Sequence, residues 1–202
     1  MKLHSFLILL LVISHSVVPV TCADSSFDGY KEIRVSESPR AFSAIPPASW
    51  VKGPIKTQST RLSLISPPET PFAACSVGVQ EIPALRDMPQ ATFNEGMVND
   101  PPSTSEMASQ LSGQYNNVSV FSRNSAFVSG FPAQLYKFQH SVGSSEGELW
   151  TYGIMVTTAT TPGLMWGVTC AGSGSSPEEA QRNYTYWQAE LVLVSGNIKI
   201  EP

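Results

Sequence analysis

A segment near the end of the chain has the apolar spacing of an amphipathic helix and limits what the rest can fold into. Five apolar residues recur at helical intervals between Pro177 and about Val194 and would form one stripe: Ala180, Tyr184, Trp187, Leu191 and Val194. A stripe with so much aromatic area must pack against another apolar surface. The strand-like runs that begin near Gly130 supply the nearest one. The sequence therefore predicts a sheet with a long C-terminal helix packed across it.

Alternating apolar runs predict strands on both sides of a pair of helices. The expected strands cover residues 41–45, 61–65, 72–82, 118–128, 133–139, 149–158 and 164–170, with turns at 143–147 and 161–163. One helix is expected from Met88 to Val98, and Ser103 with Glu106 has the capping-box spacing that opens another. Because strands and helices come in groups rather than in alternation, we expect an α+β fold with helices packed on an antiparallel sheet.

The N-terminus has the three parts of a secretory signal peptide. Lys2 supplies the basic start, an apolar run follows, and small residues lead to Ala23. We expect cleavage after Ala23 and a secreted or periplasmic protein. A lipid anchor on Cys22 is the alternative. That signal normally has Leu three residues before the cysteine and Gly or Ala directly before it, whereas Pro19 and Thr21 stand there.

The remainder of the sequence predicts an N-terminal tail followed by one domain. Residues 24–40 are polar with little apolar periodicity, so we expect a flexible tail in which residues 30–35 could add an edge strand. Residues 41–202 are expected to form a single α+β domain. No membrane span is expected, because no later stretch approaches the roughly 20 apolar residues that a transmembrane helix needs.

Two cysteines remain once the signal peptide is removed, Cys75 and Cys170. An even pair in an oxidising compartment is typical of a disulfide. It would close a loop of about 95 residues, which the chain-entropy model values at roughly 4.5 kcal/mol. Two buried free thiols are the alternative, and we expect the disulfide.

The charge balance bears on the class of partner. The chain has 12 Lys and Arg and 16 Asp and Glu, and loss of Lys2 with the signal peptide leaves a net charge of −5. A mildly acidic surface does not favour electrostatic binding to nucleic acid or to anionic lipid. We therefore expect no nucleic-acid partner, and an unknown protein or a small apolar ligand of the cell envelope instead.

Few residues of the expected mature chain could carry catalysis. His140 is its only histidine, so a metal site with two histidines is excluded, and no metal or cofactor is expected. Residues 143–147 match Gly-x-Ser-x-Gly, but a nucleophile elbow needs a strand-to-helix turn, and this motif stands between two expected strands. We expect a non-catalytic protein. The alternative is a small secreted hydrolase that uses His140 with a nearby serine or carboxylate.

The tryptophans are the main candidates for ligand or partner contact. Trp50, Trp150 and Trp166 lie in or next to expected strands, where most would be packed between sheet and helix. One that is exposed could instead contact a partner or an apolar ligand. Asn117 and Asn183 begin glycosylation sequons, which have meaning only in a eukaryotic secretory route, and the sequence leaves their use open.

The order of these features resembles a known fold. A first strand is followed by Pro46 and Trp50, two helices come after the early strands, and Gly130 to Ala133 reads Gly-x-Pro-Ala before a three-strand meander and a helix that starts with acids. Over residues 41–200 this is similar to the Mog1/PsbP-like sandwich found in small secreted bacterial proteins. The resemblance implies a binding or assembly role, since most families on that fold are described in those terms. The cysteine pair is not a general feature of the fold.

Overall fold

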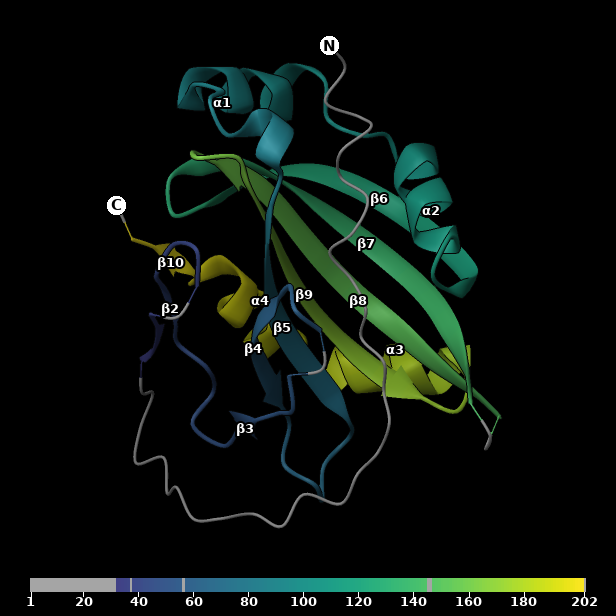
Figure 1. Cartoon of the computed structure of the whole chain (residues 1–202). Helices are drawn as coiled ribbons and strands as arrows, with labels where there is room; N and C mark the ends of the chain where they lie inside the picture. Colours follow the sequence, from purple (N-terminus) through teal and green to yellow (C-terminus); the bar gives the residue numbers. More distant parts are fainter. Residues whose placement is uncertain (1–31, 37, 56, 145–146, 202) are drawn as a thin grey trace.

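The structure is a computed structural model that describes residues 32–36, 38–55, 57–144 and 147–201. The expected signal peptide, with Cys22, and the first part of the expected tail lie outside these residues. Within them the chain forms the predicted α+β arrangement of antiparallel strands and helices (Figure 1). None of the helices in the described part combines the length and the apolarity that crossing a bilayer requires.

Seven antiparallel strands form the main sheet, in the order β3-β4-β5-β9-β8-β7-β6. Their bounds are β3 (Val51–Lys52), β4 (Thr60–Ile65), β5 (Ala73–Glu81), β6 (Asn116–Val128), β7 (Phe131–Ser144), β8 (Gly147–Thr160) and β9 (Leu164–Gly174). A second sheet, ordered β1-β2-β10, contains β1 (Ile33–Val35), β2 (Phe42–Ala44) and β10 (Lys199–Ile200). The four last long strands, β6 to β9, are a meander of consecutive hairpins, so β6 adds a fourth strand to the three-strand meander that the sequence predicts.

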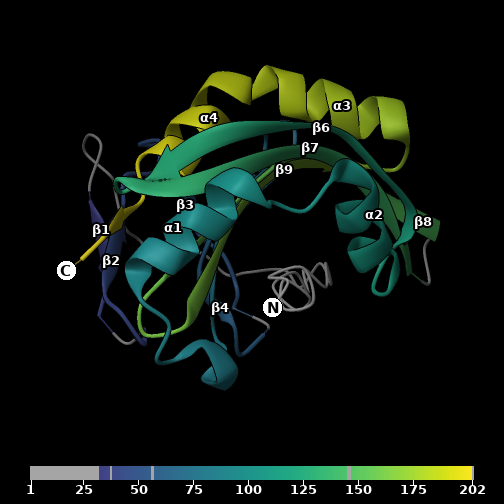
Figure 2. The same ribbon diagram turned by 90° about the horizontal axis from the view of Figure 1, so that it is seen from above.

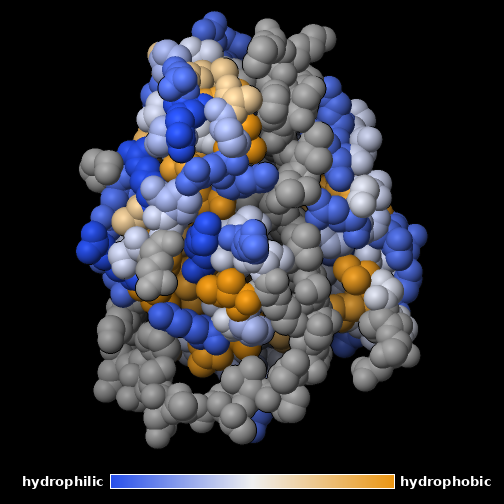
Figure 3. All heavy atoms as spheres, in the orientation of Figure 1, coloured by the Kyte–Doolittle hydropathy of each residue, from blue (hydrophilic) through white to orange (hydrophobic). Residues whose placement is uncertain are grey.

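Helices cover both faces of the main sheet. They are α1 (Gln90–Asn99), α2 (Thr104–Ser112), α3 (Pro177–Tyr186) and α4 (Gln188–Gly196). Figure 2 shows α3 and α4 on one face and α1 and α2 on the other. The second of these faces is seen in Figure 3, where hydrophobic residues come to the surface in separate places among hydrophilic ones.

Two apolar cores follow from these layers. The larger lies between the sheet and the pair α3 and α4, and the smaller lies between the sheet and the pair α1 and α2. All five residues of the predicted helical stripe are buried in the larger core. Phe93 and Met97 of α1 and Met107 and Leu111 of α2 are buried on the opposite side. The predicted capping box forms, since Ser103 and Glu106 each accept from the other's backbone N–H.

The C-terminal helix is not continuous as the stripe suggested. It breaks at Trp187, whose backbone angles (φ −101°, ψ 9°) are not helical. The Trp187 indole donates to the carbonyl oxygen of Pro71 (2.6 Å) and its ring lies edge-on to that of Trp50 (centroids 5.5 Å). Anchoring of this side chain to the loop before β5 accounts for the break, while both halves keep their apolar face on the sheet.

Strands β7 to β9 extend beyond the predicted runs. Gly143 and Ser144 pair with Glu148 and Gly147, so the expected turn at 143–147 is shorter than predicted. Strand β9 continues to Gly174, past Cys170, where the expected strand ended. At Gly172 a Cβ atom would lie 2.2 Å from the backbone nitrogen of Tyr184. Glycine there lets α3 pack directly on the strand.

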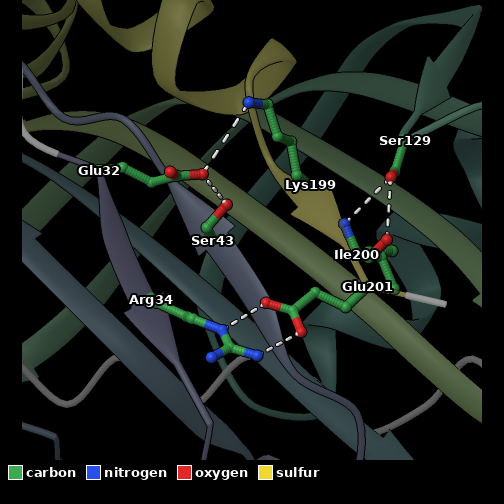
Figure 4. Close-up of polar contacts among 7 residues, drawn as sticks. All are labelled: Glu32, Arg34, Ser43, Ser129, Lys199, Ile200 and Glu201. Atoms are coloured by element: carbon green, nitrogen blue, oxygen red, sulfur yellow. Dashed lines mark hydrogen bonds and ion pairs between the residues drawn. The ribbon is translucent and has the colours of Figure 1, made fainter.

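The small sheet joins the start of the described chain to its end. Strand β1 lies inside the expected tail and pairs with β2, so residues 33–35 form the edge strand that the sequence allowed. Arg34 donates to both carboxylate oxygens of Glu201 (2.6 and 2.7 Å), and Glu32 lies 3.9 Å from the Lys199 ammonium (Figure 4). The Arg34 contact lowers the pKa of the Glu201 carboxyl below its ordinary value. We call these contacts the terminal clasp.

A candidate binding surface

The two cysteines lie directly opposite each other on neighbouring strands. Cys75 of β5 pairs in register with Cys170 of β9, and a disulfide joins them inside the larger core. Both residues are buried. Neither sulfur is therefore presented to a ligand, and the pair has a structural role.

Two of the three candidate tryptophans are part of the core. Trp50 and Trp166 are fully buried, and the Trp166 indole donates to the Thr160 hydroxyl (2.9 Å). Neither offers a ring to solvent. Trp150, near the start of β8, is half-buried and packs against the larger core with part of its surface exposed. Of the three, Trp150 alone has surface available for contact in this structure.

His140 lies within β7 on the side of α1 and α2, and it is buried. Its imidazole is stacked on the ring of Tyr115 (centroids 3.9 Å) and lies parallel to that of Phe138 (5.5 Å). This packing is that of a core aromatic residue. The neighbouring Ser141 points to the opposite face of the sheet, because side chains alternate along a strand. There its hydroxyl donates to Glu148 (3.4 Å).

The remaining motifs also have structural surroundings. The Gly-x-Ser-x-Gly run connects two antiparallel strands, although residues 145–146 lie outside the described part. Both sequon asparagines use their side-chain amides: Asn117 donates to the Ser141 hydroxyl (2.9 Å), and Asn183 donates to the Ser173 carbonyl (2.7 Å). In the described ranges no three His, Cys, Asp or Glu side chains are grouped so that they could hold a metal ion.

One region of the main sheet combines aromatic rings with exposure. Helix α3 packs on β8 and β9, and α4 packs on β9 and β5. Among the described residues, neither helix packs to a comparable extent on β6 or β7. Four side chains on the three strands from β6 to β8 form what we call the aromatic surface: Phe121, Lys137, Trp150 and Tyr152.

A bulge in β6 gives Phe121 its position. The register with β7 shifts between Val120 and Ser122, so Phe121 is the extra residue of that strand. Bulges bend a strand and re-aim the side chain at that point. The Phe121 side chain is 54% exposed, yet its ring lies 5.7 Å from that of Tyr152, which belongs to β8, two strands away. The sequence showed the strand here but gave no signal for the bulge.

The surface has one positive charge held against an aromatic ring. The Lys137 ammonium lies 5.3 Å from the ring centroid of Tyr152, within the range of a cation–π contact. Beneath it, the ring of Tyr184 on α3 lies edge-on to Tyr152 (5.4 Å). Burial raises the pKa of the Tyr184 hydroxyl, which therefore stays neutral at physiological pH. Tyr184 thus supports the Tyr152 ring on its inner side, and the exposed Phe121 and the half-buried Lys137 present an apolar group and a cation together.

Comparison with known proteins places the fold. No family model matches the chain, and no curated protein sequence matches it. The solved structure of cyanobacterial PsbP (CyanoP) from Synechocystis sp. PCC 6803 is similar over 90% of this chain and 99% of that one, with a TM-score of 0.55 and 12% sequence identity. The structure of LpqN from Mycobacterium tuberculosis, described as involved in cell envelope biogenesis, covers 87% of this chain and 93% of its own, with a TM-score of 0.47 and 11% identity. The predicted fold is confirmed: the chain has the PsbP-like α+β sandwich.

Proposed function

We propose that the protein is exported and acts as a binding or accessory protein, with the aromatic surface as its contact with a partner protein. One observation carries the proposal: Phe121 is 54% exposed on a face of β6 against which α3 and α4 do not pack, beside a cation held over Tyr152. Aromatic residues are enriched in the buried cores of protein interfaces. A positive charge beside such a residue favours an acidic group on the partner. The partner expected from this chemistry offers an apolar group and an acidic side chain.

The distribution of reactive groups supports a non-catalytic role. His140 is stacked on Tyr115 within the core, and Cys75 and Cys170 are bonded to each other. A general base must reach the proton that it removes, and a buried ring covered by another ring has no path to a substrate. The hydrolase alternative therefore has no support from the geometry around His140.

The proposed export begins with the removal of residues 1–23, which leaves residues 24–202 as the mature protein. Mass spectrometry of the protein recovered from its natural source tests this step. We expect a mature chain that starts with an unmodified Asp24. A mass that includes an acylated Cys22 would show that the protein is lipid-anchored and not released as a free chain. A chain that retains Met1 would contradict export.

The aromatic surface can be tested by photo-crosslinking in the cells that make the protein. The full chain is expressed with a photoreactive phenylalanine analogue at position 121 or, as the control, at position 72, which holds an exposed phenylalanine before β5. We expect a discrete cross-linked product from position 121, and Lys137→Glu should reduce its yield at least tenfold because it reverses the charge.

Equal products from positions 121 and 72 would contradict the proposal, as would a product from position 121 that Lys137→Glu leaves unchanged. Thermal melting of each variant shows whether the fold is retained. The Lys137 side chain is only half-buried, so its replacement should leave the melting temperature within a few degrees of that of the parent protein.

A further inference from the structure

The main sheet ends in two edges of very different length. At one edge β3 has only two residues, whereas β6 at the other has 13. In the described part of the chain β6 pairs with β7 alone (Figure 1). Its outer row of backbone N–H and C=O groups is therefore open to another strand. An edge of this length is a template for pairing unless the sequence protects it.

The second half of β6 has little of the usual protection. From Ser122 to Val128 it contains no proline, and Arg123 is its only charged residue. The Arg123 guanidinium donates to the carbonyl oxygens of Pro101 and Pro102 (3.0 and 3.2 Å) and stays exposed. Phe127 is 69% exposed on the strand. Helix α2 packs on β6, but the residues of β6 in its core, Val118 and Val120, belong to the first half.

The regular part of this edge has a defined centre. The bulge between Val120 and Ser122 ends regular pairing on one side. On the other side the turn at Ser129 and Gly130, both with positive φ (53° and 82°), ends the strand after Val128. The seven residues between these limits are centred on Ser125.

We propose that β6 pairs with β6 of a second copy of this chain, antiparallel, about a two-fold axis at Ser125. The two main sheets then become one continuous sheet. An isologous contact of this kind needs a surface that is complementary to itself. The bulge and the turn select the register, because only pairing centred on Ser125 uses all seven regular residues of both copies.

The side chains fit this register. Opposite residues have numbers that add to 250, so Phe127 of each copy lies across from Arg123 of the other, on the side of α1 and α2. A guanidinium over an aromatic face is a favourable contact. The two Arg123 side chains do not face each other, and no acidic residue lies on the strand. Both exposed Phe127 rings lose solvent contact. Phe121 is not part of this register, so the pairing is independent of the proposed function.

A cysteine at the axis tests the register directly. Directly opposite residues of antiparallel strands have Cα atoms about 4.5–5.5 Å apart, which suits a disulfide. In the mature protein, in which the native cysteines are already paired, Ser125→Cys should form a disulfide-linked dimer with oxidised glutathione. Ser119→Cys, at another exposed position of the same strand, is the control. Its two copies would be about 40 Å apart, so it should give at least tenfold less dimer.

Sedimentation equilibrium provides a second readout that needs no cysteine. The parent protein should dimerise reversibly with rising concentration. Phe127→Lys should weaken this association at least tenfold, because the new lysine would lie opposite Arg123 of the other copy and the two positive charges repel each other. Phe72→Lys, at an exposed site outside β6, should leave it unchanged. Equal cross-linking through positions 125 and 119, or a parent protein that is monomeric at all concentrations, would overturn the proposal.

Discussion

Two buried polar side chains of β7 connect segments that are distant in the sequence. The Tyr136 hydroxyl, on β7, donates to the Pro102 carbonyl between α1 and α2 (2.8 Å), and the Gln134 amide donates to the Met97 carbonyl at the end of α1 (2.7 Å). Both side chains are buried. A hydrogen bond of this kind contributes about 1 kcal/mol net, and the unmade bond costs more when the donor or acceptor is buried.

Tyr136 makes stability depend on pH in the alkaline range. Burial is the main cause that raises its pKa to about 12, from an ordinary value of 10.0. The folded state therefore keeps a proton that the unfolded chain releases first. The contribution of Tyr136 is fully present below about pH 10 and is lost as the pH rises toward about 12.

Tyr136→Phe should consequently change the pH dependence as well as the stability. At pH 7 we expect the free energy of unfolding to fall by about 0.5–1.5 kcal/mol through loss of the hydrogen bond. Between pH 9 and 11 the difference from the parent protein should shrink, since the variant has no tyrosine at this site to ionise. Urea unfolding at several pH values measures both effects. A constant difference across this range would show that Tyr136 does not titrate as the burial implies.

At the scale of elements, the sequence predicted most of the helices and strands, because the apolar periods and the caps are local signals. The capping box of α2 and the buried stripe of α3 and α4 follow from spacing alone. The break at Trp187 does not, because its cause is a contact with the loop before β5, more than 100 residues earlier in the chain. Local periodicity contains no information on such a contact.

The candidate surface was less predictable than the fold, for the same reason. Phe121 owes its exposure to a bulge, and alternation of apolar residues does not show where one strand slips against another. In the sequence, Trp50, Trp150 and Trp166 all lie in or next to an expected strand and cannot be told apart. Their positions within the layers bury Trp50 and Trp166 and leave Trp150 half-buried. Which aromatic residue is exposed depends on where the helix layer ends, and that is a property of the packed structure.

For the whole molecule, two long-range connections join segments that are far apart in the sequence. The terminal clasp joins Arg34 of β1 to Glu201 just after β10, and the disulfide joins Cys75 of β5 to Cys170 of β9. The loop that the disulfide closes spans 95 residues and contains both α1 and α2 and the strands β6 to β8. It therefore includes the aromatic surface and the open edge of β6.

The disulfide should stabilise the protein mainly by restricting the unfolded chain. A closed loop of this length is worth about 4.5 kcal/mol in the chain-entropy model. Replacing both cysteines with alanine should lower the free energy of unfolding by roughly that amount, while the circular dichroism spectrum of the folded state stays the same. Strands β5 and β9 are already paired through nine residues of register, so the fold does not need the bond to define it.

Urea unfolding with and without a reductant separates the effects: the reductant should destabilise the parent protein and leave the double variant unchanged. Equal stability of the parent and the double variant without reductant would contradict the assignment, because a bond that closes this loop must reduce the entropy of the unfolded state.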